Sequence, residues 1–192
     1  MDTPTGIILA IDPGPTQSAY CLYRESEIVS AAKVENVDLL ESIRAQDWEF
    51  DALAVEMIAS YGMAVGAETF QTCVWIGRFA EAWESQAACR EATLVPRLAV
   101  KLHLCKRGNA KDPNVRQALI DRFGGSAALI KSKRCPVCKG IGWRLLRDET
   151  KRCPKCTGTG SLGADGALAG ITGDCWSALG VAITVAEGEQ RR

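Results

Sequence analysis

Short runs of apolar residues dominate the first 35 positions and predict a β-meander. The apolar runs cover 7–12, 18–24 and 27–34, and they are separated by Pro13-Gly14-Pro15 and by the polar corner Glu25-Ser26. Chain breakers and polar corners between apolar runs are typical of turns between strands. We therefore predict three consecutive antiparallel strands, the first of which ends in Asp12.

The next two segments predict a short helix and a fourth strand. Residues 37–46 fit the helix, and DALAVEM at 51–57 is an apolar run that ends in Glu56. Asp51 and Glu56 are five positions apart, so their side chains point to opposite faces of a strand. Only one of these two acids can therefore join Asp12.

Residues 64–88 predict a long helix with an unusually wide apolar surface. Its apolar residues occupy well over half of a helical wheel, which is more than one core face requires. They are Phe70, Val74, Trp75, Ile76, Phe79, Ala80 and Trp83. The surplus fits burial against a second subunit, and it fits equally a helix enclosed within its own domain.

The last apolar segments complete a mixed α/β pattern. Residues 92–104 predict a further strand that leads into a basic segment, with His103 in mid-strand and without a role. A helix then begins with Asp112 as its N-cap and Pro113 at its first helical position, and Gly124-Gly125 ends it. The final helix covers 174–187. The order β-β-β-α-β-α-β-α, an insertion, and α predicts an α/β domain with strands in both directions.

Length and hydropathy favour a small intracellular protein. A chain of 192 residues suits one domain with a small accessory module. No stretch approaches the roughly 18 to 20 apolar residues that span a bilayer, and the run at 7–11 is too short for a signal peptide core. We therefore expect no membrane span and an intracellular location.

The net charge of zero hides an uneven distribution. Residues 1–96 carry 5 basic and 15 acidic side chains, whereas residues 97–160 carry 16 basic and 4 acidic ones. A strongly basic middle segment indicates an anionic partner, most often nucleic acid, although a merely solvated basic face is the simpler alternative.

Four of the nine cysteines form the pattern C-x2-C-x14-C-x2-C, and the other five lie singly in apolar segments. Two CxxC pairs at this spacing supply four thiolates to one tetrahedral zinc and leave no open position, so we predict one structural Zn²⁺ on Cys135, Cys138, Cys153 and Cys156. Each pair is followed by Gly-x-Gly, and the element resembles the CxxCxGxG repeats of the DnaJ zinc-binding region. We therefore assign 131–160 to an inserted zinc-binding module, and 1–130 with 161–192 to the main domain.

Three acids at the ends of elements suggest a second metal site. Asp12 and Glu56 each end an apolar strand, and Asp174 opens the last helix. If the two strands are parallel neighbours, their carboxylates meet at one edge of the sheet, where a divalent cation relieves the repulsion. A pair of Mg²⁺ ions on such acids hydrolyses phosphodiesters. Taken singly, Asp12 could instead cap a turn, Glu56 could lie at an exposed strand end, and Asp174 could be an ordinary N-cap.

An ordered set of segments resembles the RuvC family of Holliday junction resolvases, particularly its bacteriophage members. The segments are ILAIDPG, DALAVEM, VPRLAVKLHLCKRGNAK before DPNVRQAL, and DCWSALGVAIT. The resemblance implies an RNase H-like fold with a mixed five-stranded sheet flanked by helices, a homodimer, a bacterial or phage-infected host cytoplasm, and cleavage of branched DNA with Mg²⁺ or Mn²⁺, two ions per active site.

The resemblance also implies roles for individual residues. Asp12, Glu56 and Asp174 match the metal-binding acids, but Ser177 stands where the family has a second closing aspartate. Lys101 matches one basic catalytic residue. The other falls at Asp112, so Lys111 is the nearest candidate. The basic residues that we expect to contact DNA are Lys101, Lys106, Arg107, Lys111, Lys133, Arg134 and Arg144.

Two other functions stay open. A YqgF-like RNA-processing nuclease shares the DPG opening and the RNase H-like fold. A non-catalytic nucleic-acid-binding zinc protein would explain Ser177 as a trace of lost catalysis, although Asp12, Glu56 and Asp174 are intact. An actin-like kinase needs a second, duplicated half for which the chain has no room.

Overall fold

The computed structural model divides the chain into two compact units. It describes residues 6–59, 62, 65–86, 91–139, 141, 143–146, 149–157, 159, 161–162 and 164–189. One unit comprises Met1–Leu119 and Ile171–Arg192, and the other comprises Ile120–Gly170. The predicted insertion at 131–160 falls within the second unit. Among the described residues, no helix has both the length and the apolar character that crossing a bilayer requires.

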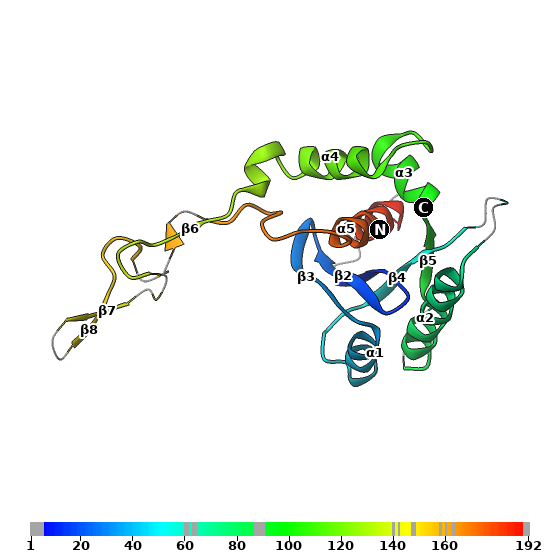
Figure 1. Cartoon of the computed structure of the whole chain (residues 1–192), viewed down its shortest axis with the longest axis horizontal. Helices are drawn as coiled ribbons and strands as arrows, with labels where there is room; N and C mark the ends of the chain where they lie inside the picture. Colours follow the sequence, from blue (N-terminus) through cyan, green and yellow to red (C-terminus); the bar gives the residue numbers. More distant parts are fainter. Residues whose placement is uncertain are drawn as a thin grey trace. The chain divides into compact units, whose positions relative to one another are not determined.

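A mixed five-stranded sheet forms the centre of the first unit, in the order β3-β2-β1-β4-β5 (Figure 1). Its strands are β1 (Ile8–Asp12), β2 (Gln17–Arg24), β3 (Glu27–Glu35), β4 (Ala52–Met57) and β5 (Thr93–Pro96). The first three strands form the predicted antiparallel meander, whereas β1, β4 and β5 are parallel to one another. The predicted fold class, a mixed five-stranded sheet flanked by helices, is confirmed.

The two faces of the sheet carry side chains of different size. Large residues such as Leu9 and Val55 pack against α1 (Asn36–Ala45) and α2 (Ala67–Glu84) in one hydrophobic cluster. Small residues alternate with them and point to the other face, where Ala10 and Ala54 are fully buried. There α5 (Cys175–Glu189) packs across β1, β2 and β4. Small side chains let this helix approach the sheet closely.

The strand predicted within residues 92–104 is confirmed in its first part, but its extension through His103 is wrong. The strand β5 stops at Pro96, and α3 spans Arg97–Cys105, so His103 is helical. Val100 and Leu104, one turn apart, lie against Gly180 of α5. The apolar residues of this segment thus have helical spacing, and packing against α5 favours a helix here. His103 Nε2 lies 2.8 Å from Glu187 Oε2 of α5.

The helix α4 (Asp112–Arg122) follows, and glycines end it as predicted. Gly124 and Gly125 have φ of 99° and 75°, a conformation that favours glycine, and a short 3₁₀ helix, η1 (Gly125–Leu129), comes next. The remaining strands form two small antiparallel ribbons in the second unit. In one, β6 (Lys133–Arg134) pairs with β9 (Ser161–Leu162), and in the other, β7 (Trp143–Leu146) pairs with β8 (Glu149–Arg152).

Candidate functional site

The register of the sheet places charged residues in one row. Asp12 pairs with Ala19 of β2, and Ala19 pairs with Lys33 of β3. On the other side Ile11 pairs with Val55 of the parallel strand β4, so the next residues along, Asp12 and Glu56, are neighbours at the carboxyl end of the sheet. Paired residues on adjacent strands point to the same face. The row therefore lies on the face that α5 covers.

The turn after Asp12 is held by a buried hydrogen-bond network. The Asn36 amide donates to the carbonyl of Gly14 at 2.9 Å, and the Ser18 hydroxyl donates to Asn36 Oδ1 at 2.6 Å. A Cβ at Gly14 would lie 2.3 Å from the carbonyl oxygen of Gln17. This position therefore requires glycine, and the chain leaves Asp12 by a fixed path.

Asp12 is a partly buried carboxyl group among like charges. Burial is the main cause that raises its pKa to about 7, and the charges of Glu56 and Asp174 add to it. The charge of Arg97 and a hydrogen bond from the Ser177 hydroxyl act in the opposite direction. A carboxylate in this position favours a cation beside it.

Glu56 is paired with an arginine. Arg97 Nη1 donates to Glu56 Oε2 at 3.2 Å, while Nη2 of the same guanidinium donates to Asp112 Oδ1 at 2.7 Å. Burial raises the pKa of Glu56, against the opposing effect of Arg97. The hydrogen bond from Arg97 lowers the pKa of Asp112, which is exposed. Arg97 thus bridges an inner and an outer carboxylate.

Asp174 lies just before α5 and is bound by a lysine of the sheet. Lys33 Nζ is 2.7 Å from Asp174 Oδ2, and this contact raises the pKa of Lys33. Both side chains are about half exposed. Ser177, the third residue of α5, donates to Asp12 rather than supplying the fourth acid that the family pattern has. The three acids therefore approach each other from β1, β4 and the start of α5.

The basic residues expected at the site are placed differently from one another. Lys101 of α3 is half-buried and close enough for its charge to lower the pKa of Glu56. Lys111 is exposed just before α4, and within the described part of the chain its side chain forms no ion pair with a site acid. Lys106 and Arg107 are exposed after the end of α3. Of these four basic residues, only Lys101 is thus shown to lie close enough to affect one of the acids.

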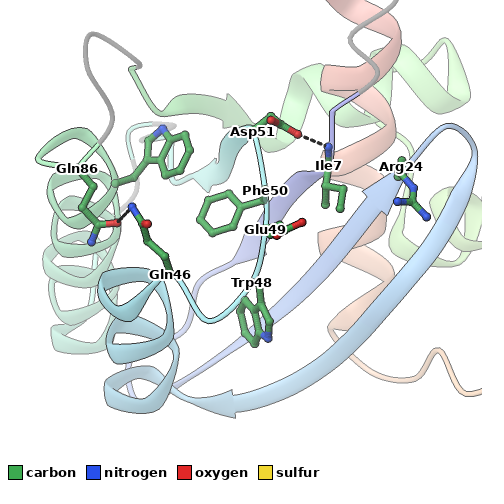
Figure 2. Close-up of a pocket in the computed structure, with 9 residues that line it drawn as sticks. Ile7, Arg24, Gln46, Trp48, Glu49, Phe50, Asp51 and Gln86 are labelled. Carbon is green, nitrogen blue, oxygen red and sulfur yellow. Dashed lines mark hydrogen bonds between the residues drawn. The ribbon is translucent and has the colours of Figure 1, made fainter.

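Two cavities lie at opposite ends of the sheet. One of about 390 Å³ borders Asp174 and Ser177, at the carboxyl ends of the parallel strands. The other, of about 640 Å³, is lined by Ile7 and Asp51, which precede β1 and β4 (Figure 2). Asp51 Oδ2 accepts a hydrogen bond from the Ile7 amide there, so Glu56 is the acid that lies near Asp12. Open α/β sheets bind ligands at the carboxyl ends of their strands.

The four cysteines of the second unit form a compact cluster. All four are buried, and their sulfur atoms lie within 4.8 Å of one another. Cys135 Sγ is 3.8 Å from Cys153 Sγ, and Cys138 Sγ is 3.6 Å from Cys156 Sγ. These separations are too long for disulfides and suit four sulfur ligands around one ion. The cluster could hold one metal ion.

The two CxxC segments have the same local geometry. The residue after each second cysteine has a positive φ, 53° at Lys139 and 51° at Thr157. The amides of Ile141 and Thr159 donate to the carbonyls of Cys138 and Cys156. The sequence repeat is thus also a structural repeat. Of the basic residues expected to contact DNA in this unit, Lys133 and Arg134 are exposed in β6, and the side chain of Arg144 in β7 lies outside the described part.

Sequence reasoning missed two cations of the site, Arg97 and Lys33. Arg97 was assigned to a strand with its apolar neighbours, and its role depends on α3 beginning there. The signal for Lys33 was available only in the pairing of β1, β2 and β3, because Lys33 shares a row with Asp12.

Two solved structures of Thermus thermophilus RuvC are similar to the chain over most of its length. One is 14% identical, covers 96% of each chain and has a TM-score of 0.54. The other, T. thermophilus RuvC in complex with a Holliday junction substrate, is 15% identical, covers 97% of this chain and 96% of that one, and has a TM-score of 0.59. No family model matches the chain, and no curated protein does. At this identity the similarity establishes the RNase H-like fold.

Proposed function

We propose that the chain is a divalent-metal-dependent endonuclease that cleaves four-way DNA junctions. The observation that carries this proposal is the approach of Asp12, Glu56 and Asp174 at the carboxyl end of the sheet, where burial and the charges of the other two acids raise the pKa of Asp12 to about 7. The fold is that of RuvC, and one RuvC structure was solved with a Holliday junction substrate. Fold similarity alone does not assign a reaction, so the proposal depends on the three acids.

The three acids fit a site for Mg²⁺ or Mn²⁺. Carboxylate oxygens are the ligands that these hard cations prefer, and Asp12 is a partly buried carboxyl group whose charged form a nearby cation would stabilise. Two bound ions would activate a water and stabilise the leaving oxygen of the phosphodiester. Lys101, whose charge lowers the pKa of Glu56, would bind the phosphate beside the acids. Lys111 is proposed for the same role from sequence order alone.

The four cysteines would hold one structural Zn²⁺, since four sulfurs complete a tetrahedral site. Zinc would fix a segment that carries the exposed residues Lys133 and Arg134, for which we propose contacts with DNA. Lys106 and Arg107 in the first unit, and Arg144 in β7, complete the proposed set of DNA-binding residues.

We further propose a homodimer that uses the outer face of α2. Phe70 and Val74, one turn apart on that helix, are 62% and 61% exposed. A second copy of the chain would bury them, and a symmetric dimer supplies the two active sites that paired nicks in a junction require. Substituting both residues by glutamate should convert the dimer to a monomer in sedimentation or light-scattering measurements.

The test is cleavage of synthetic four-way junctions in Mg²⁺, compared with duplex, flapped and RNA substrates. We expect paired nicks in the junction. Preferential cleavage of RNA would favour the YqgF-like alternative instead. If the wild-type protein cuts no branched DNA, the proposed nuclease function is wrong.

Asp12→Asn separates chemistry from binding. The variant should lose cleavage and keep junction affinity without added Mg²⁺, because affinity comes mostly from the basic surface. Asp38→Asn, at an exposed position in the first turn of α1, is the matched control and should cleave normally. Equal cleavage by the Asp12 variant would show that the acids are not the active site.

A further inference from the structure

The cavity of about 390 Å³ beside the acids is lined by cationic, aromatic and acidic side chains. They come from α3, α4 and the start of α5: Arg97, Asp112, Pro113, Val115, Arg116, Gly173, Asp174, Trp176 and Ser177. A cavity of this size accommodates a small polar group together with part of the molecule that bears it. Because Asp174 and Ser177 belong to it, whatever enters lies next to the proposed metal-binding acids.

Arg116 is an exposed arginine that is held over a fixed ring. Its Cζ lies 4.9 Å from the centre of the Trp176 ring, and Trp176 is only 8% exposed. Stacking orients a guanidinium without using its N–H donors. Among the described residues, no carboxylate or carbonyl accepts a hydrogen bond from the Arg116 guanidinium. Its donors are therefore available to an anion.

The neighbouring residue on the same helix face cannot supply this positive charge. Asp112 precedes Arg116 by one turn of α4, and both residues line the cavity. Asp112 stands where the RuvC pattern has a basic residue, and Arg97 neutralises it at 2.7 Å. Arg116 thus restores a cation to the helix face from which the family pattern has lost one.

We propose that Arg116, stacked on Trp176, binds a phosphate of the DNA backbone in this cavity, next to the bond that is cut. This inference rests on the proposed nuclease function. The planar guanidinium matches two phosphate oxygens, which a phosphate in the cavity would present. Trp176 is a positioning residue that holds the guanidinium at the cavity that Asp174 also lines.

The first test measures junction affinity against salt concentration without added Mg²⁺. Arg116→Met should weaken binding about tenfold, as expected for the loss of one charge-assisted hydrogen bond, and should lower the slope of log K against log salt by about 0.9. Arg116→Lys should keep the slope. Arg44→Met, which removes an exposed arginine of α1, is the control and should match the wild type.

The second test locates the phosphate and the role of the ring. A series of junctions is made, each with one neutral methylphosphonate at a different position near the cleaved bond. At one of these positions the substitution should weaken binding by the wild type and leave the affinity of Arg116→Met unchanged. Trp176→Phe should keep the salt slope, and Trp176→Leu should lower it as Arg116→Met does.

The outcomes separate the two proposals. If the wild type nicks junctions but Arg116→Met has the same affinity and slope, the role of Arg116 is wrong and the nuclease proposal stands. If the wild type neither binds nor nicks junctions, the nuclease proposal is wrong, and the proposed role of Arg116 is wrong with it. Should Trp176→Leu fail to fold, the methylphosphonate comparison on Arg116→Met still decides.

Discussion

The two candidate metal sites of this chain differ in how their charge is balanced. The four buried thiols of the second unit lie within 4.8 Å of one another, and the ligand set closes on itself. The acids of the first unit are instead paired with cations of the protein, Lys33 with Asp174 and Arg97 with Glu56. A complete set of soft ligands suits a permanent structural ion. A set of acids that is partly neutralised by side chains suits an ion that arrives with, or beside, a substrate.

This difference predicts opposite effects of removing the ligands. Without its ion, the cysteine cluster loses the interaction that holds the second unit together, so this unit should be destabilised. The carboxylates repel one another, so their neutralisation should stabilise the fold while it removes the chemistry.

The largest effect is expected at the cysteine cluster. Cys135→Ser should abolish zinc binding, which is commonly worth on the order of 10 kcal/mol, and should unfold the unit of residues 120–170. Amide spectra of the full chain should lose the dispersed signals of this unit and keep those of the sheet. Cys73→Ser, at an exposed position on α2, should retain full zinc content. Normal zinc content in the Cys135 variant would contradict a four-sulfur site.

The second effect is a pH dependence of stability at Asp12. Its folded pKa of about 7 exceeds the ordinary value of 3.8, so the folded state holds this proton more tightly than the unfolded state. The contribution of protonated Asp12 to the free energy of unfolding is therefore fully present below pH 3.8 and is lost as the pH rises through about 7. Asp12→Asn removes this loss and should be more stable than wild type at pH 8, by on the order of 4 kcal/mol at most.

Denaturant unfolding at several pH values, without added Mg²⁺, measures this difference. The two proteins should have nearly equal stability at pH 4, and Asp38→Asn should follow the wild type throughout. Mg²⁺ should then stabilise only the proteins that keep Asp12. An Asp12→Asn variant less stable than wild type at pH 8 would mean that the carboxylate already has sufficient partners.

The two sites also differ in how far the sequence predicts them. The cysteine ligands lie within 135–156, and their spacing alone predicts a metal cluster. The acids are spread over three elements, and their approach depends on the parallel pairing of β1 and β4 and on where α5 begins. Strand ends could be predicted from apolar runs that stop at an acid.

The cations could not be predicted, for the same topological reason. Arg97 contacts Glu56 because α3 starts immediately after Pro96, whereas the apolar residues of 92–104 alone favour a strand. The helical pattern of Val100 and Leu104 acquires meaning only when α5 lies against it. Tertiary packing therefore decided both the local structure and the partner of Glu56.

A third, smaller effect is expected at Arg97. Arg97→Met leaves Glu56 without its partner, and a partly buried charged group left unpaired should cost about 1 to 3 kcal/mol at pH 8. Asp112→Asn removes only the exposed arm of the bridge and should cost less than about 1 kcal/mol. Unfolding free energies of the two variants give the comparison. Equal losses would show that the bridge to Glu56 adds nothing beyond the surface pair.

The smallest effect on stability, and the sharpest test of competition, concerns Lys33. Its ion pair with Asp174 is about half exposed, so Lys33→Met should change stability by less than about 1 kcal/mol. If the lysine competes with Mg²⁺ for Asp174, the variant should bind Mg²⁺ severalfold more tightly in calorimetric titrations at low salt, and the gain should shrink as salt screens the charge.

Arg44→Met, which breaks the exposed pair with Glu81, should leave Mg²⁺ affinity unchanged. Weaker Mg²⁺ binding by Lys33→Met would mean that the lysine holds Asp174 in place for the ion. The contrast between the two sites would then narrow, because the cations of the protein would build the carboxylate site, as the sulfur atoms build the other, and would not compete for it.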